Sequence, residues 1–250
     1  MELFKASKQW SERPADERFW DLAEMRAKCA EYKSSAVEST VKFGELRVEA
    51  DKGEVKIVGK TNVPARLTHW SFGQLCARAD APASYMRTIP ATLAAQNLNH
   101  GLANRNGDGN AQDDATKLLL HKNGDFVLRA ANGPGYSRIW NSDIVSRLET
   151  NLPKGWRVPP ARPAGIENER TRIAVASDVL ALQKEVLSIK VGDKIAPAGL
   201  YASDHDMFAF LVNEDSTVDD GSGHGLGRGF FIWNSEVGAA TLGIATFLFD

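Results

Sequence analysis

Hydrophobic and polar residues repeat with two periods along this chain, one typical of helices and the other of strands. Apolar residues at helical spacing predict a first helix between residues 14 and 34. Alternating apolar and polar positions in 41–48 and 54–58, on either side of a turn that contains Lys52-Gly53, predict a β-hairpin. The first quarter of the chain therefore mixes both kinds of element.

A second hairpin is predicted by the strongest short-range signal in the chain. Two strands, at 117–121 and 126–130, flank the dipeptide Asn123-Gly124, which is typical of a tight hairpin turn. A helix is expected to follow at 142–152, with Ser142 as its N-terminal cap.

The stretch between the two hairpins predicts short helices separated by proline. The segments 68–76, 80–86 and 91–102 each show helical spacing, and Pro90 interrupts the last pair. A helix-turn-helix is one interpretation of this stretch, and helices packed only for structure are the favoured one. A polar, glycine-rich loop is expected at 104–114.

The last third of the chain predicts strands between long irregular segments. Four prolines make 153–163 a stiff connector, and 172–190 mixes strand and helix signals. Short apolar strands are expected at 207–212 and 230–234, joined by a long acidic loop at 213–229.

Together these elements predict an α+β fold of antiparallel β-hairpins with short helices packed on one side. We expect an N-terminal helix and hairpin in 1–64 and a larger domain in 65–250, which has a helical piece at 65–103 and an α+β remainder. The chain ends within an apolar run, so we expect it to be truncated at its C-terminus.

Composition narrows the class of protein. Hydrophobic residues make up 43% and charged residues 25% of the 250 positions, as in ordinary globular proteins. No apolar run approaches the length of a membrane span, and the N-terminus lacks the pattern of a signal peptide. The two cysteines, Cys29 and Cys76, stand far apart and predict buried thiols rather than a disulfide or zinc site. We expect a cytoplasmic protein without a membrane partner.

Charge is distributed unevenly along the chain. Residues 61–200 carry seventeen Lys and Arg against twelve Asp and Glu, whereas residues 201–250 carry one Arg against eight acids. A basic middle segment is typical of a face that binds polyanions, and chance unevenness on a solvated surface is the alternative.

The basic middle segment also contains interleaved aromatic residues. Single-strand binders use cations for phosphates and aromatic rings for bases, so this pattern predicts a nucleic-acid-binding face. We expect Arg129 and Arg138 to meet in one groove. The alternative is that the aromatic residues belong to the core and the cations to the ordinary surface. The predicted binding residues within this segment are Lys117, Lys122, Arg129, Tyr136, Arg138 and Trp140.

No complete catalytic apparatus is present in the sequence. Asp204-His205-Asp206, with His224 and Glu236, is the one set that suggests a divalent ion, but its spacing matches no known metal motif. The chain has no phosphate-binding glycine loop and no nucleophile elbow, and no dinucleotide fingerprint either. We therefore predict no catalytic residue, no metal site and no cofactor.

Several strings in the sequence are similar to one family. They are Leu67–Leu75, Pro82–Met86, Gly135–Asn141, Asp206–Leu211 and, most specifically, Arg228–Gly238. With these strings the chain resembles the phage/plasmid-like family built on domain of unknown function 932, over about residues 65–250. The resemblance implies the company of phages, plasmids and mobile elements, and it adds Arg228 and Trp233 to the predicted binding face. Asn234–Gly238 is interpreted either as a ligand-binding strand end or, preferably, as a helix cap followed by close packing at Gly238.

Three functions follow from these patterns. The first is nucleic-acid binding in phage or plasmid replication or recombination, including single-strand DNA annealing by a homo-oligomer. The second is a metal-dependent hydrolase or nuclease that uses the Asp204–Asp206 set. The third is a protein-interaction module that antagonises a host defence system through its acidic end.

Overall fold

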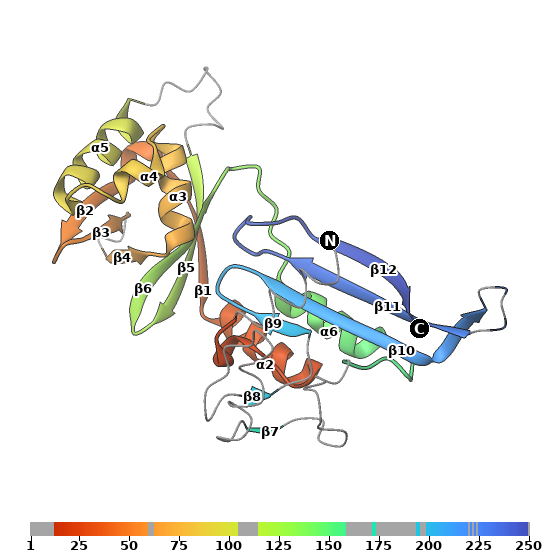
Figure 1. Ribbon diagram of the computed structural model, residues 1–250. Helices are drawn as coiled ribbons and strands as arrows, with labels where there is room; N and C mark the ends of the chain where they lie inside the picture. Colours follow the sequence, from red (N-terminus) through yellow and green to blue (C-terminus); the bar gives the residue numbers. More distant parts are fainter. Residues whose placement is uncertain are drawn as a thin grey trace. The chain divides into compact units, whose positions relative to one another are not determined.

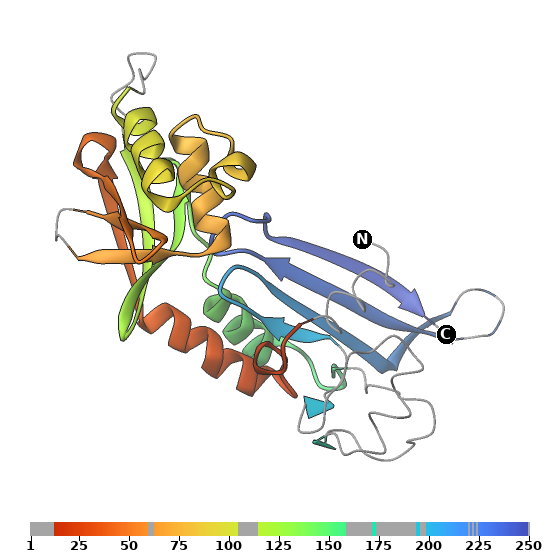
Figure 2. The same ribbon diagram turned by 60° about the vertical axis from the view of Figure 1, so that its left-hand side comes forward.

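The computed structural model describes residues 13–59, 63–104, 115–158, 172–173, 194–195, 199–219, 221, 223 and 225–249. These residues form two compact units, each made of segments distant in sequence (Figures 1 and 2). The four-stranded unit comprises Met1–Ala30, Ile139–Ser235 and Ala240–Asp250, and the six-stranded unit comprises Glu31–Arg138 and Glu236–Ala239.

The six-stranded unit has one sheet covered on one face by helices (Figure 1). Its strand order is β1-β5-β6-β4-β3-β2, and all neighbours are antiparallel except β4 and β6. The strands are β1 (Ala36–Lys42), β2 (Arg47–Asp51), β3 (Glu54–Val58), β4 (Pro64–Leu67), β5 (Ala115–Asn123) and β6 (Asp125–Asn132). The helices are α3 (His69–Arg78), α4 (Ala83–Met86) and α5 (Ala91–Ala103), and a short 3₁₀ turn, η2 (Phe43–Glu45), joins β1 to β2.

Alternation along the strands builds the core of this unit. Every second residue of each strand faces the helices, so that Val41, Leu118 and Ile57 lie in one apolar layer with Leu75 and Leu98 of α3 and α5. All five side chains are less than 7% exposed. Burial of this layer is the main stabilising contribution to the unit.

The four-stranded unit has an antiparallel sheet of order β12-β11-β10-β9. Its elements are η1 (Ala15–Glu17), α2 (Leu22–Ser34) up to Ala30, α6 (Asn141–Asn151), β9 (Leu200–Ala202), β10 (Met207–Asp219), β11 (Gly225–Asn234) and β12 (Gly243–Phe249), with a separate pair β7 (Arg172–Ile173) and β8 (Lys194–Ile195). The last turn of α2, from Glu31 to Ser34, belongs to the six-stranded unit. Met25 of α2 and Val145 of α6 pack on Met207 and Ala209 at one face of the sheet. Phe208 and Phe231 point to the other face, where further aromatic residues surround them.

These elements confirm the predicted α+β fold, including both hairpins. In the first hairpin Lys52 and Gly53 both have positive φ (50° and 82°), as a tight turn between twisted strands requires. In the second hairpin Gly124 has a φ of 74°. No helix among the described residues is long and apolar enough to span a bilayer.

Three sequence expectations need correction. The single strand expected at 41–48 is two strands, because η2 turns the chain between β1 and β2. The loop expected at 213–229 is largely strand: β10 runs to Asp219, pairs with β11 beyond a bulge after Asn213, and exposes most of its acidic side chains. Ser142 lies inside α6 and does not cap it, since the helix begins after Trp140.

The expected domain boundary at residue 64 is also not where the chain divides. The β2–β3 hairpin lies in the same sheet as β4, so residues on both sides of 64 share one core. The expected glycine-rich loop at 104–114 and the mixed segment at 172–190 lie mostly outside the described residues, and so do residues 159–163 of the expected connector.

Candidate nucleic-acid interface

The predicted binding residues lie in different units. Lys117, Lys122, Arg129, Tyr136 and Arg138 belong to the six-stranded unit; Trp140, Arg228 and Trp233 belong to the four-stranded unit.

Arg129 is buried, which removes it from the predicted binding face. Its side chain is 2% exposed and donates to Glu236 Oε2 at 3.0 Å, and the Glu236 side chain is 1% exposed. The guanidinium also lies 5.0 Å from the centre of the Tyr32 ring. A phosphate would have to displace a buried carboxylate to reach Arg129, so this prediction is corrected.

Arg138 is also largely enclosed and does not share a groove with Arg129. Its side chain is 5% exposed, and Nε donates to Glu38 Oε1 at 2.6 Å. The guanidinium lies 5.4 Å from the Tyr136 ring centre, and Lys117 Nζ donates to the Tyr136 carbonyl at 2.9 Å. Arg138 and Lys117 thus hold the segment that follows β6 in place.

The remaining predicted residues are scattered. Lys122 is exposed and lies 5.9 Å from the Phe126 ring centre. Trp140 is half-buried at the start of α6, where its carbonyl accepts from Asp143 N. Arg228 and Trp233 are five positions apart on the regularly paired strand β11, so they project from opposite faces of the sheet.

A basic pocket on the six-stranded unit was missed by the sequence analysis. Its volume is about 340 Å³, and its lining includes Arg66 of β4, His69 and Phe72 of α3, and Arg87 after α4. We call these four residues the basic pocket. Glu54 is the one carboxylate among its lining residues.

The arginines of the basic pocket are exposed, and one of them is positioned by its neighbours. Arg87 donates from its guanidinium to the His69 carbonyl at 2.9 Å and lies 5.2 Å from the Phe72 ring centre. Arg66 makes no ion pair with any described residue. Two guanidinium groups beside an aromatic ring match what phosphates and bases need.

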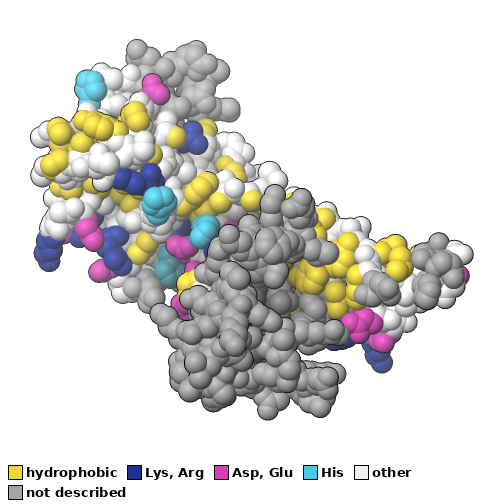
Figure 3. All heavy atoms as spheres, in the orientation of Figure 1, with side chains coloured by type: hydrophobic (Ala, Val, Ile, Leu, Met, Phe, Trp, Pro, Cys, Tyr) yellow, Lys and Arg dark blue, Asp and Glu magenta, His cyan; other side chains and the backbone are white. Residues whose placement is uncertain are grey.

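The surroundings of the pocket favour an anionic ligand. Described residues 63–104 contain three Arg and two His against Asp80 alone. Figure 3 shows Lys, Arg and His side chains over α3 and β4, with hydrophobic side chains and some Asp and Glu side chains beside them. Two aromatic residues of the same helical layer, Trp70 and Tyr85, are 37% and 55% exposed.

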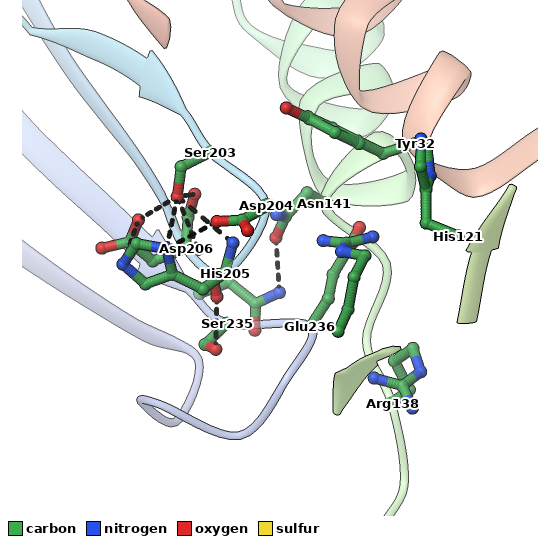
Figure 4. A network of polar contacts seen from close by, with 12 residues as sticks. Tyr32, His121, Arg138, Asn141, Ser203, Asp204, His205, Asp206, Ser235 and Glu236 are labelled. Carbon is green, nitrogen blue, oxygen red and sulfur yellow. Dashed lines mark hydrogen bonds and ion pairs between the residues drawn. The ribbon is translucent and has the colours of Figure 1, made fainter. Parts of the chain in front are cut away.

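The Ser203–Asp206 loop carries neither a metal site nor a catalytic triad. It joins β9 to β10, and the buried Ser203 Oγ accepts from the backbone N–H of His205 and Asp206 at 3.2 and 3.1 Å (Figure 4). Ser203 Oγ and Asp204 Oδ1 both approach His205 Nδ1, whereas a triad places serine and carboxylate on different imidazole nitrogens. The loop is a hydrogen-bonded turn.

Hydrogen bonding and burial around this loop raise the pKa values of His205 and Tyr201. The hydrogen bond to Asp204, helped by the charge of Asp206, raises the pKa of His205. Burial raises the pKa of Tyr201 to about 12, and Arg13 lies 4.4 Å from its ring while donating to Asp206 at 2.6 Å. The described residues contain no group of three metal-ligating side chains; His224 lies outside them, and Glu236 is paired with Arg129.

The most specific motif of the sequence, Asn234–Gly238, is structural. Asn234 donates to the Ile139 carbonyl and to Asn141 Oδ1 at 2.9 and 2.7 Å. Ser235 donates to the His205 carbonyl at 2.6 Å. No helix follows, so the predicted cap is wrong.

The second half of the motif belongs to the six-stranded unit. The Val237 carbonyl accepts from Trp70, Gln74 and Asn132 at 3.2, 2.8 and 2.9 Å. Gly238 has a φ of 84°, and an added Cβ would lie 3.0 Å from the Asn132 amide, which confirms the predicted close packing.

Comparison of the chain with protein-family models gives no match, and comparisons with curated proteins and with solved structures give none either.

Proposed function

We propose that this chain binds single-stranded nucleic acid through the basic pocket of the six-stranded unit. The carrying observation is the pair of exposed arginines, Arg66 and Arg87, which line a cavity of about 340 Å³ together with Phe72. Arginine forks bind phosphate oxygens in pairs, and a ring beside them offers a face for a base. Neither contact depends on base identity, so binding is expected to tolerate many sequences.

The biological setting we propose is replication or recombination of phages or plasmids in the cytoplasm. The resemblance in Leu67–Leu75 and Arg228–Gly238 supports this setting. The first of these strings covers His69 and Phe72, which line the pocket. Single-strand annealing is the activity we propose within this setting, because it requires nucleic-acid binding and no bond-breaking step.

The test is fluorescence anisotropy with a labelled single-stranded oligonucleotide and its duplex over a series of salt concentrations. For single strands, log K falls with log salt with a slope of about −0.7 per phosphate contact. The double variant Arg66→Ala, Arg87→Ala should therefore make the slope less negative by about 1.4. The matched control is Lys42→Ala with Arg47→Ala, which removes two exposed cations of the same unit outside the pocket. An unchanged slope in the pocket variant refutes the proposal.

A variant that removes a negative charge from the pocket should have the opposite effect on binding. Glu54 contributes a carboxylate to the pocket lining, and one nearby surface charge contributes about 1 kcal/mol. Glu54→Gln should therefore tighten binding roughly fivefold at low salt. Weaker binding by this variant would contradict the assignment of the pocket to an anion.

A further inference from the structure

Among the described residues, strand β12 is an unpaired edge of the four-stranded sheet. It pairs with β11 along one side, and no strand among the described residues pairs with its other side. Its sequence, Gly243–Phe249, contains no charged residue and no proline, the two devices that commonly prevent edge strands from pairing. Ile244 and Leu248 on one face of the strand are 62% and 50% exposed.

The pairing of β12 with β11 follows a small-against-large pattern. Gly227 lies opposite Phe249, Gly229 opposite Phe247, and Gly243 opposite Trp233. In each pair the ring occupies the space that a Cβ on the glycine would need, at 2.7, 2.0 and 2.1 Å. Aromatic rings on this face therefore lie across glycine positions of the neighbouring strand, and Figure 3 shows hydrophobic side chains gathered over β11 and β12.

We propose that β12 pairs with β12 of a second copy of this chain, antiparallel and symmetric about Thr246. A two-fold axis at Thr246 places Gly243 opposite Phe249 of the second copy and Ala245 opposite its Phe247. The small-against-large pattern of the β11–β12 pair is thus repeated across the axis. On the other face Ile244 meets Leu248 of the second copy, so the most exposed apolar residues cover each other.

Symmetry and charge agree with a second copy as the occupant. A two-fold interface must be self-complementary, and seven residues with one threonine at the centre meet that requirement on both faces. The strand carries no charge, so two copies approach without repulsion along the ladder. An unrelated partner would not need this internal symmetry.

The size of the interface sets the expected affinity. At the roughly 30–40 Å² per residue of ordinary interfaces, seven residues from each copy bury about 500 Å² in total, which is the size of a weak, transient contact. We therefore expect a reversible dimer with a dissociation constant of about 1–100 μM.

Sedimentation velocity over a concentration series tests the proposal. The native chain should pass from monomer to dimer in that range, and Thr246→Lys should weaken dimerisation by tenfold or more because two like charges then meet at the axis. The control is Thr40→Lys, the same change on the exposed edge strand β1 of the other unit, and it should leave the equilibrium unchanged.

Thr246→Cys gives a second test, in which a disulfide bond traps the dimer even if association is weak. Facing positions in an antiparallel pair bring Cβ atoms to about 4.5–5.5 Å, close to disulfide distance, so mild oxidation should give a covalent dimer. Cys29 and Cys76 are buried, and Thr40→Cys should remain monomeric under the same conditions. A chain that is monomeric at all concentrations overturns the proposal, as does a dimer that both Thr246 variants leave unaltered. Neither outcome bears on nucleic-acid binding.

Discussion

The buried ion pair between Arg129 and Glu236 makes a quantitative prediction. We consider Glu236→Gln, which keeps the shape of the side chain and a hydrogen-bond acceptor for Arg129 but removes the negative charge. Both side chains are almost fully buried, at 2% and 1% exposure, so the guanidinium would remain in a low-dielectric site without its counter-charge. Removing one partner of such a pair costs about 3–5 kcal/mol.

The lower end of that range is expected here. The glutamine still accepts a hydrogen bond at 3.0 Å, and Tyr32 offers a ring face 5.0 Å from the guanidinium. A loss of about 3 kcal/mol is nevertheless large against a total stability of about 5–15 kcal/mol for a typical protein. Glu236 also begins the segment whose Val237 carbonyl accepts from Trp70, so the tryptophan environment should change as well.

Urea unfolding followed by circular dichroism measures the loss in the free energy of unfolding. Hydrogen exchange in 115–132 and in 207–234 then reports the stability of the six-stranded and the four-stranded unit separately. The matched control is Glu149→Gln, whose partner Arg26 is 49% exposed; an exposed pair contributes about 0–1 kcal/mol. If Glu236→Gln costs no more than the control, the pair is not buried in solution. Arg129 would then become available again as a phosphate ligand.

Two further predictions concern the four-stranded unit. Gly229→Ala places a Cβ 2.0 Å from the Phe247 ring and should lower the free energy of unfolding by about 1–3 kcal/mol. The control Gly44→Ala, which has no atom within 4 Å of its added Cβ, should leave the melting temperature unchanged. Equal melting temperatures for the two variants would contradict the placement of the Phe247 ring. The pKa of His205 is raised in the folded state by Asp204, so its stabilising contribution is complete below 6.5 and is lost as pH rises through the folded value. His205→Gln should remove that part of the pH dependence of unfolding, and a profile identical to that of the native chain would show that the Asp204 hydrogen bond is absent in solution.

The elements that were predicted correctly depend on local chemistry. Asn123-Gly124 and Lys52-Gly53 turn the chain within a few residues. The helix expected over 14–34 forms only from Leu22 to Ser34, where Met25 and Cys29, one turn apart, are buried. The loop expected at 213–229 failed for a different reason. Its residues have no apolar alternation, and β10 extends there because β11 supplies hydrogen bonds from more distant positions.

The candidate site was harder to predict than the fold. Arg66 and Arg87 lie 21 positions apart and share one pocket only because β4 leads into α3 and the chain then returns through α4. Composition indicated the basic segment but not which of its cations are exposed. The residues around Arg129 in the sequence do not show that its side chain is buried. Its partner, Glu236, lies 107 positions further along the chain.

The motif Asn234–Gly238 shows why a specific sequence string need not mark a ligand site. Asn234 and Ser235 donate to backbone carbonyls of the four-stranded unit, while Val237 receives three side-chain donors in the six-stranded unit. The Asn234 and Ser235 side chains and the Val237 carbonyl thus each have hydrogen-bond partners within their own unit. The exposed arginines of the basic pocket have the opposite character. Apart from one hydrogen bond and one ring contact of Arg87, no hydrogen bond or ion pair with a described residue holds either arginine, and for that reason they, rather than the most specific string, carry the proposed function.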